Sequence, residues 1–161
     1  MIKGIESFVF QSSKALRLIS GVALTFLMLL TIADVILRAF GKPIVGAYEL
    51  VAFSGAIVIG FALPITSWHR GHIYVEFITD ILPKKIRNAF HIITRLMGII
   101  FFLLAGWNLF LVGMDLKRNQ EVSLTLRLPF YPIAYGLAVS AFLLCLVLCV
   151  DIFKIVRGEY E

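Results

Sequence analysis

Charged residues are scarce in this chain of 161 residues, since Asp, Glu, Lys and Arg together make up 16% of it. Soluble globular proteins contain about 25% of these residues. Hydrophobic residues reach 60%, and a soluble domain of this length has too little interior to bury so much apolar surface. Long apolar runs also exclude a disordered chain. We therefore predict a membrane protein.

Residues that build secreted scaffolds or catalytic sites are also few. Two cysteines cannot form a disulfide framework, and Cys145 and Cys149 lie four residues apart within an apolar stretch, where packing is the expected role. The sequence has no phosphate-binding glycine loop, no catalytic serine or cysteine motif and no acidic metal cluster. We therefore expect no enzymatic activity, no cofactor and no metal ion.

Four apolar stretches are long enough to cross a bilayer. A transmembrane helix needs about 20 largely apolar residues. The expected spans are residues 15–37, 49–68, 93–115 and 128–151. The alternation typical of transmembrane β-strands is missing. The predicted fold is an all-α integral membrane protein with four transmembrane helices, a single membrane domain over residues 1–161, because the connections are too short to form another domain.

Lysine and arginine are distributed unevenly between the two sides of these spans. Of the 15 such residues, only Arg38, Lys42, Lys117, Arg118 and Arg127 lie on the side of the first and third connections. Because positive residues accumulate on the cytoplasmic side, we expect both termini and the middle connection in the cytoplasm. No cleavage site follows the first apolar run, so we expect that span to remain as an uncleaved anchor.

Two segments beside the spans have an amphipathic pattern. Residues 2–12 have a weak apolar face, and residues 84–95 carry polar side chains along one helical stripe: Lys84, Arg87, Asn88, His91 and Arg95. We expect short interfacial helices there that contact phospholipid headgroups. The alternative is a positive flank that only sets the orientation of the chain.

Polar residues within or beside the spans are the candidates for subunit and lipid contacts. Asp34 and Arg38 lie four residues apart at the end of the first span, which favours an ion pair near the outer surface. Glu49 begins the second span, where a carboxylate suits the positive end of the helix dipole. Asn108 is the deep polar residue, and its amide can hydrogen-bond across helices for about 0.6–2 kcal/mol. Arg95 begins the third span.

Histidine supplies the alternatives that involve a cofactor or metal. His69, His72 and His91 lie between the second and third spans and not in mid-span, so haem ligation from facing helices is poorly supported. His69, His72 and Glu76 have a spacing that suits a metal on one helix face, but Gly71 interrupts the segment. We favour surface or interface roles for these histidines.

Three segments of the sequence resemble the small membrane subunit of TRAP transporters, the tripartite ATP-independent periplasmic family. They are ADVILRAFGKPIVGAYELVAFSG (33–55), GFALPITSWHRGHIYVEFITDILP (60–83) and SLTLRLPFYPIAYGLAVSAF (123–142). The resemblance extends from the first span to the end of the fourth. Each motif is short, so their order and spacing within a four-helix chain carry the comparison.

Individual positions match the pattern of this family. Asp34 and Arg38 match the D-x-x-x-R that ends the first span, and Glu49 matches the E of an E-L pair that opens the second. A signature H-I-x-V-(D/E) follows the second span and is matched by His72, Ile73, Val75 and Glu76. Glu76 stands where the family most often has Asp, which leaves the expected role of this segment unchanged.

The resemblance implies one subunit of a three-part system in the bacterial inner membrane. A periplasmic binding protein captures an organic acid, such as a C4-dicarboxylate or sialic acid, and a large membrane subunit moves it with a sodium gradient. The small subunit is expected to be a scaffold for the large one, without a substrate site, and to help dock the binding protein. Outer cations suited to that docking are Lys42, Lys117, Arg118 and Arg127. Nucleic acid is not an expected partner.

Two other functions remain open from the residues alone. The first is a haem-bearing membrane anchor of a quinone-linked dehydrogenase, which a visible spectrum would identify. The second is a small exporter that works as a homodimer, which would transport a substrate without other subunits.

Overall fold

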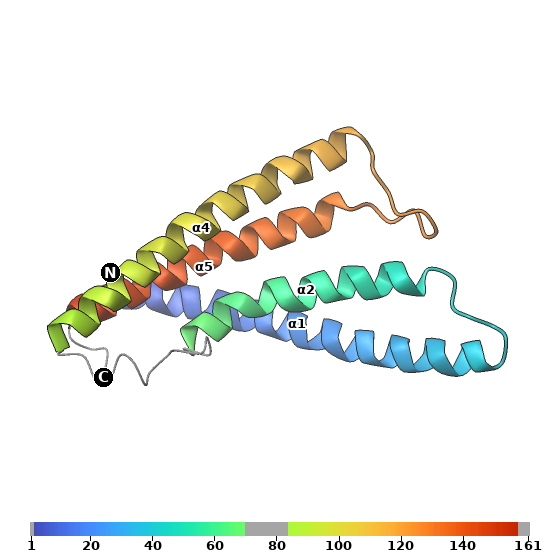
Figure 1. Cartoon of the computed structure of the whole chain (residues 1–161), viewed down its shortest axis with the longest axis horizontal. Helices are drawn as coiled ribbons and strands as arrows, with labels where there is room; N and C mark the ends of the chain where they lie inside the picture. Colours follow the sequence, from blue (N-terminus) through green and yellow to red (C-terminus); the bar gives the residue numbers. More distant parts are fainter. Residues whose placement is uncertain (1, 70–83, 158–161) are drawn as a thin grey trace.

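The computed structural model describes residues 2–69 and 84–157, and this part of the chain forms four long helices (Figure 1). They are α1 (Ile2–Ala39), α2 (Ala47–Trp68), α4 (Lys84–Arg118) and α5 (Tyr131–Arg157). Segments apolar and long enough to cross a membrane are Glu6–Ala39, Ala47–Trp68, Phe90–Arg118 and Tyr131–Ile155. The prediction of an all-α chain with four helices able to span a membrane is confirmed.

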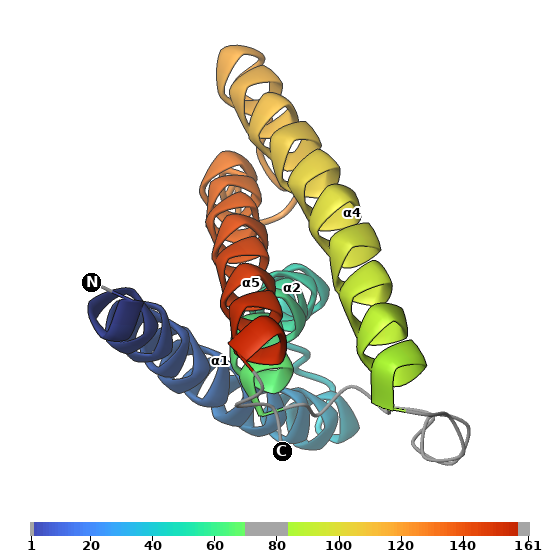
Figure 2. The ribbon, with the colours of Figure 1, turned by 90° about the vertical axis from the view of Figure 1, so that its left-hand side faces the viewer.

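The helices pack as two antiparallel pairs. α1 packs on α2, α4 packs on α5, and the pairs are joined through α2 and α5. α1 and α4 therefore lie on opposite sides of the α2–α5 pair (Figure 2). α5 has neighbours on more than one side and supplies most of the buried apolar side chains, among them Ala138, Leu144 and Val147. α1 and α4 each leave a broad apolar face uncovered.

Small residues let these helices approach closely at their crossing points. A side chain at Gly60 of α2 would collide with Leu137 of α5, and the Ser140 hydroxyl donates a hydrogen bond of 2.6 Å to the carbonyl oxygen of Gly60. On α4, a Cβ atom at Gly113 would lie 2.9 Å from the ring of Tyr135. Packing within this chain therefore accounts for small residues at these crossings.

α1 is longer than a single membrane crossing requires. Its 38 residues correspond to about 57 Å, against a hydrocarbon core of about 30 Å. Residues 2–12, expected to form a short interfacial helix, belong to α1, which runs without a break from Ile2. Val9 is buried, and the ring of Phe10 lies 5.4 Å from that of Trp68 in α2, so packing keeps this first part of α1 in line with the span.

The two ends of the molecule differ in their connections. The hairpin end, as we call it, contains the connections 40–46 and 119–130, whereas the first residues of α1 and the last residues of α5 lie at the opposite, terminal end (Figure 1). α1 stops at the hairpin end because Gly41 adopts a left-handed conformation with φ of 74°, and the Lys42 amide then bonds to the Leu37 carbonyl at 2.9 Å.

Candidate subunit-contact surfaces

The ion pair at the end of α1 closes the connection 40–46 against α2. Arg38 Nη2 lies 2.5 Å from Asp34 Oδ2, as the four-residue spacing predicts, and Asp34 Oδ1 accepts a hydrogen bond of 2.9 Å from the Ile44 amide. Arg38 also donates to the Tyr48 hydroxyl at 3.1 Å, and its guanidinium carbon lies 5.4 Å from the centre of the Tyr48 ring. This pair therefore shapes the hairpin end.

Glu49, in the first turn of α2, binds the tip of the connection 119–130. One carboxylate oxygen accepts a hydrogen bond from the Thr125 amide at 2.7 Å. The other accepts from the Ser123 hydroxyl at 2.7 Å and from the Leu126 amide at 2.9 Å. We call this set of three hydrogen bonds the Glu49 latch. It joins the α1–α2 pair to the α4–α5 pair at the hairpin end.

A close backbone approach accompanies the Glu49 latch. Gly46 precedes α2 with φ of 77°, and a Cβ atom there would lie 2.5 Å from Leu126 Cγ. Only glycine satisfies both the left-handed conformation and the contact without strain. The latch holds the tip so that Leu124 projects with 97% of its side chain exposed.

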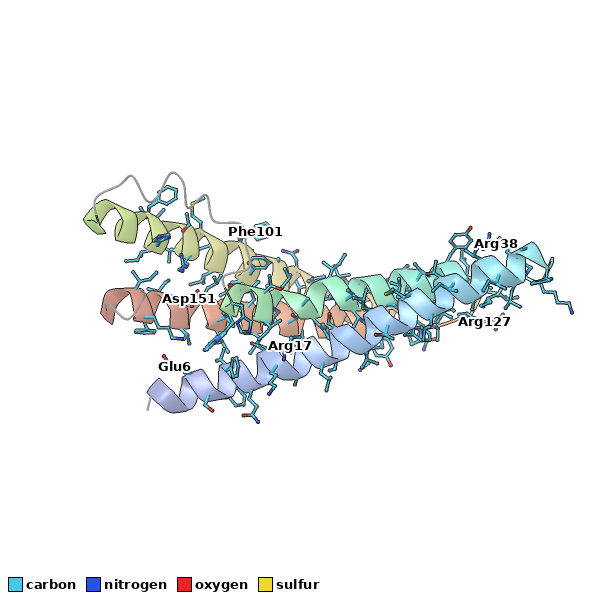
Figure 3. The ribbon with its side chains drawn as sticks, turned by 90° about the horizontal axis from the view of Figure 1, so that it is seen from below. Glu6, Arg17, Arg38, Phe101, Arg127 and Asp151 are labelled. Atoms are coloured by element: carbon cyan, nitrogen blue, oxygen red, sulfur yellow. The ribbon has the colours of Figure 1, made fainter. Side chains whose placement is uncertain are left out.

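A second ion pair lies toward the terminal end, between α4 and α5. Arg95 Nε is 3.6 Å from Asp151 Oδ2, and the two side chains are 3% and 9% exposed. Arg95 also donates to the His91 carbonyl oxygen at 3.2 Å. Arg95, expected at a subunit or lipid interface, therefore contacts this chain's own α5. Figure 3 shows Asp151 and the Arg38–Arg127 region toward opposite ends of the molecule.

Asn108 lies on the exposed side of α4. Its side-chain nitrogen donates a hydrogen bond of 3.1 Å to the Leu104 carbonyl oxygen of the same helix. It makes no hydrogen bond across helices within the described residues, so the interhelical bond expected for it does not form inside this chain.

The cations expected to meet a binding protein gather at the hairpin end. Their side chains are all exposed: Lys42, Lys117, Arg118 and Arg127. Lys42 belongs to the connection 40–46, the next two to the last turn of α4, and Arg127 to the connection 119–130, where its φ is 53°. Arg38 and Arg127 appear at this end in Figure 3. We call these four residues the cationic surface.

Comparison of the sequence with models of protein families decides which family the chain belongs to. Residues 27–158 match the family described as the DctQ component of tripartite ATP-independent periplasmic transporters. The chain belongs to this family. The resemblance found in the sequence is thereby confirmed, and the chain is the small membrane subunit of a TRAP transporter. No curated protein matches it.

Membership in the DctQ family settles the class of the protein. DctQ is a component of transporters and not an enzyme family, and its membership implies association with a large membrane subunit and a periplasmic binding protein. The four span-forming helices agree with a multi-pass membrane protein. Neither the haem-bearing anchor nor the homodimeric exporter receives support from this match.

Some of the candidate contact residues predicted from the sequence lie wholly or partly outside the residues that the structure describes. His72 and Glu76 fall outside the described residues, and Arg87 lies in α4 with a side chain that is also outside them. Among the residues described, no three His, Cys, Asp or Glu side chains gather to hold a metal ion.

The partners of the candidate residues were not visible in the sequence. Ser123, which binds Glu49, and Asp151, which binds Arg95, lie 74 and 56 positions away from them, and no local spacing rule reaches that far. A weak signal was present for Asp151, since it is the acidic residue that ends the fourth apolar stretch, as Arg95 begins the third. Facing charges at equal depth in neighbouring spans are candidates for pairing.

Proposed function

We propose that this DctQ chain is the scaffold subunit of a sodium-driven transporter for organic acids in the bacterial inner membrane. It holds the large transport subunit in place and helps dock the periplasmic binding protein. The cargo class, a C4-dicarboxylate, sialic acid or a similar carboxylate, follows from the family resemblance.

The use of the polar side chains supports a scaffold role. Asp34 and Arg38 shape one connection, Glu49 holds the other, and Arg95 and Asp151 bind each other between α4 and α5. A substrate carboxylate needs cations or hydrogen-bond donors that remain open within the membrane. The five charged side chains just named are instead engaged in holding this chain's own helices and connections together.

Docking of the binding protein is assigned to the hairpin end. The excess of Lys and Arg beside the terminal end favours a cytoplasmic location for that end, which leaves the hairpin end in the periplasm. The cationic surface then faces the binding protein, and acidic patches on that protein are its complement. Complementary charge raises the rate of encounter more than the final affinity.

Reconstitution tests the scaffold role directly. Proteoliposomes with the large subunit, this chain and the loaded binding protein should take up the organic acid when a sodium gradient is applied. Liposomes that lack only this chain should show background uptake, and so should liposomes that contain this chain alone. Uptake by this chain alone, or full uptake without it, would contradict the proposal.

A further inference from the structure

The amide of Asn108 is only partly satisfied. A primary amide offers two N–H donors and a carbonyl acceptor, and here one donor binds the Leu104 carbonyl oxygen at 3.1 Å. Within the described residues the other donor and the acceptor have no partner. Asn108 lies four residues from the midpoint of Phe90–Arg118, or about 6 Å along the helix axis, so it sits deep in the span. Lipid tails cannot bond to it.

The two exposed threonines of α1 have no such deficit. Thr25 and Thr31 are also exposed on a span, but each hydroxyl donates to the carbonyl oxygen four residues earlier, at 3.0 and 2.7 Å. A threonine whose donor is satisfied by its own helix is compatible with lipid. Asn108 of α4 therefore differs from these two threonines of α1, because its amide keeps an unmet N–H donor.

Asn108 also stands in a regular stripe of exposed residues. Steps of four and three residues alternate along α4 through Phe90, Thr94, Met97, Phe101, Leu104, Asn108, Leu111, Asp115 and Arg118, all of them exposed. This is the spacing of a coiled-coil seam, in which two helices pack side by side. A single Asn in such a seam sets the register and the number of helices that associate. We call Met97–Leu111 of this stripe the Asn108 seam; Phe101 is labelled in Figure 3.

We propose that the Asn108 seam packs against one transmembrane helix of the large membrane subunit, and that a polar side chain of that helix binds the Asn108 amide. This assignment rests on the proposed scaffold function and specifies the helix face that performs it. The exposed aromatic and aliphatic side chains of the seam supply the packing, because Phe101 and Met97 are each 65% exposed and Leu104 is 57% exposed.

A second copy of this chain is a poorer occupant of the seam. Two copies inserted in the same direction and related by a twofold axis would bring identical positions of the whole stripe together, including Asp115 and Arg118 beyond the seam. Asp115 would then face Asp115, and Arg118 would lie beside Arg118, so like charges would oppose the contact. A different helix can place complementary groups at both positions.

Photo-crosslinking in membranes that contain the complete transporter identifies the occupant. A benzophenone amino acid is placed at Phe101 or Leu104 of the seam and, as a matched control, at Phe26, an exposed phenylalanine on α1. We expect an adduct with the large subunit at both seam positions, at least about tenfold stronger than at position 26. An adduct with a second copy, no protein adduct at the seam, or equal yields on α1 and α4 would overturn the proposal.

Substitution of the amide tests the hydrogen bond within the seam. Asn108→Leu keeps a similar volume and favours membrane insertion, so the chain should remain in the membrane at normal levels. We expect the affinity for the large subunit to fall about 3- to 30-fold in detergent titrations of the co-purified complex. Asn108→Gln should recover part of the loss, and Thr31→Val, on α1, should change nothing.

The outcomes separate this inference from the scaffold function. If the unaltered chain does not co-purify with the large subunit, the scaffold function fails. If it co-purifies, and Asn108→Leu binds as tightly as the unaltered chain, the seam assignment fails and the scaffold function stands.

Discussion

Glu49 acts as a single residue that stabilises a connection far away in the sequence. All three of its partners, the Ser123 hydroxyl and the amides of Thr125 and Leu126, are donors. A carboxylate has acceptors only, so it fits this tip, whereas an amide would present its own donor to at least one of the three. Two neighbouring backbone N–H groups directed at one carboxylate form the kind of anion nest that also occurs at helix starts.

Replacement of Glu49 by Gln should therefore loosen the tip of the connection 119–130. We expect the amides of Thr125 and Leu126 to exchange their hydrogens about tenfold faster, since charge-assisted bonds are roughly twice as strong as neutral ones. Hydrogen exchange followed by mass spectrometry measures this effect. Glu121→Gln, in the same connection, is the control and should leave the exchange of these two amides unchanged. Equal exchange in both variants would contradict the latch.

At the scale of the element, α4 and α5 combine close packing with a buried ion pair. Gly106 and Gly113 of α4 face α5. A Cβ atom at Gly106 would lie 3.3 Å from carbons of Ala141 and Phe142, and one at Gly113 would lie 2.9 Å from the Tyr135 ring, which is closer than a side chain permits. Arg95 and Asp151 then fix one register between the helices, because a slip of one residue would separate two charges that the apolar surroundings cannot solvate. Apolar packing alone discriminates less between registers.

Removal of one partner from the Arg95–Asp151 pair should lower the free energy of unfolding more than removal of both partners does. Arg95→Leu or Asp151→Leu leaves a charge buried, at a cost of about 3–5 kcal/mol in unfolding free energy. The double variant removes the remaining charge as well and should recover at least half of the loss. Unfolding in detergent, followed by circular dichroism, gives the double-mutant cycle. Additive losses would show that the pair is not coupled.

At the scale of the whole molecule, charge is sorted between the two ends. At the hairpin end Asp34 and Glu49 are engaged inside the chain, so the four exposed residues of the cationic surface outnumber the exposed carboxylates there, Asp115 and Glu121. This end therefore offers positive charge to a partner although both kinds of charge are present there. The apolar outer faces of α1 and α4 complete the surface and lie along the spans.

Reversal of charge at the hairpin end should weaken docking of the binding protein. The variant Lys42→Glu/Lys117→Glu/Arg118→Glu/Arg127→Glu should lower uptake at limiting binding protein by about tenfold, mainly through slower association. The defect should shrink as salt is raised, because salt screens exposed charges. A matched control reverses Lys14 and Arg17, exposed cations toward the other end of α1, and should take up substrate normally. Unchanged uptake in the fourfold variant would contradict the docking role.

Prediction from sequence succeeded where the physical rule was local. The Asp34–Arg38 pair follows from a spacing of four residues on one helix, and the four spans follow from the distribution of charge. The weak amphipathic pattern of residues 2–12 did not reveal that Phe10 would lie against Trp68 and that α1 would run without a break from Ile2.

The sequence by itself determined the number of helices able to span a membrane, because transfer of apolar side chains into lipid depends on composition and length, not on neighbours. It also determined the family, because the order and spacing of short motifs are properties of the sequence. Only the tertiary structure decided which polar residues serve this chain and which remain for others. Glu49 and Arg95 looked alike as charges at span ends, yet each has a partner more than fifty residues away. Asn108, among the described residues, bonds only within its own helix. The physical reason is that a hydrogen bond or ion pair requires its two groups within a few ångströms, and only the packing of α2, α4 and α5 sets those distances.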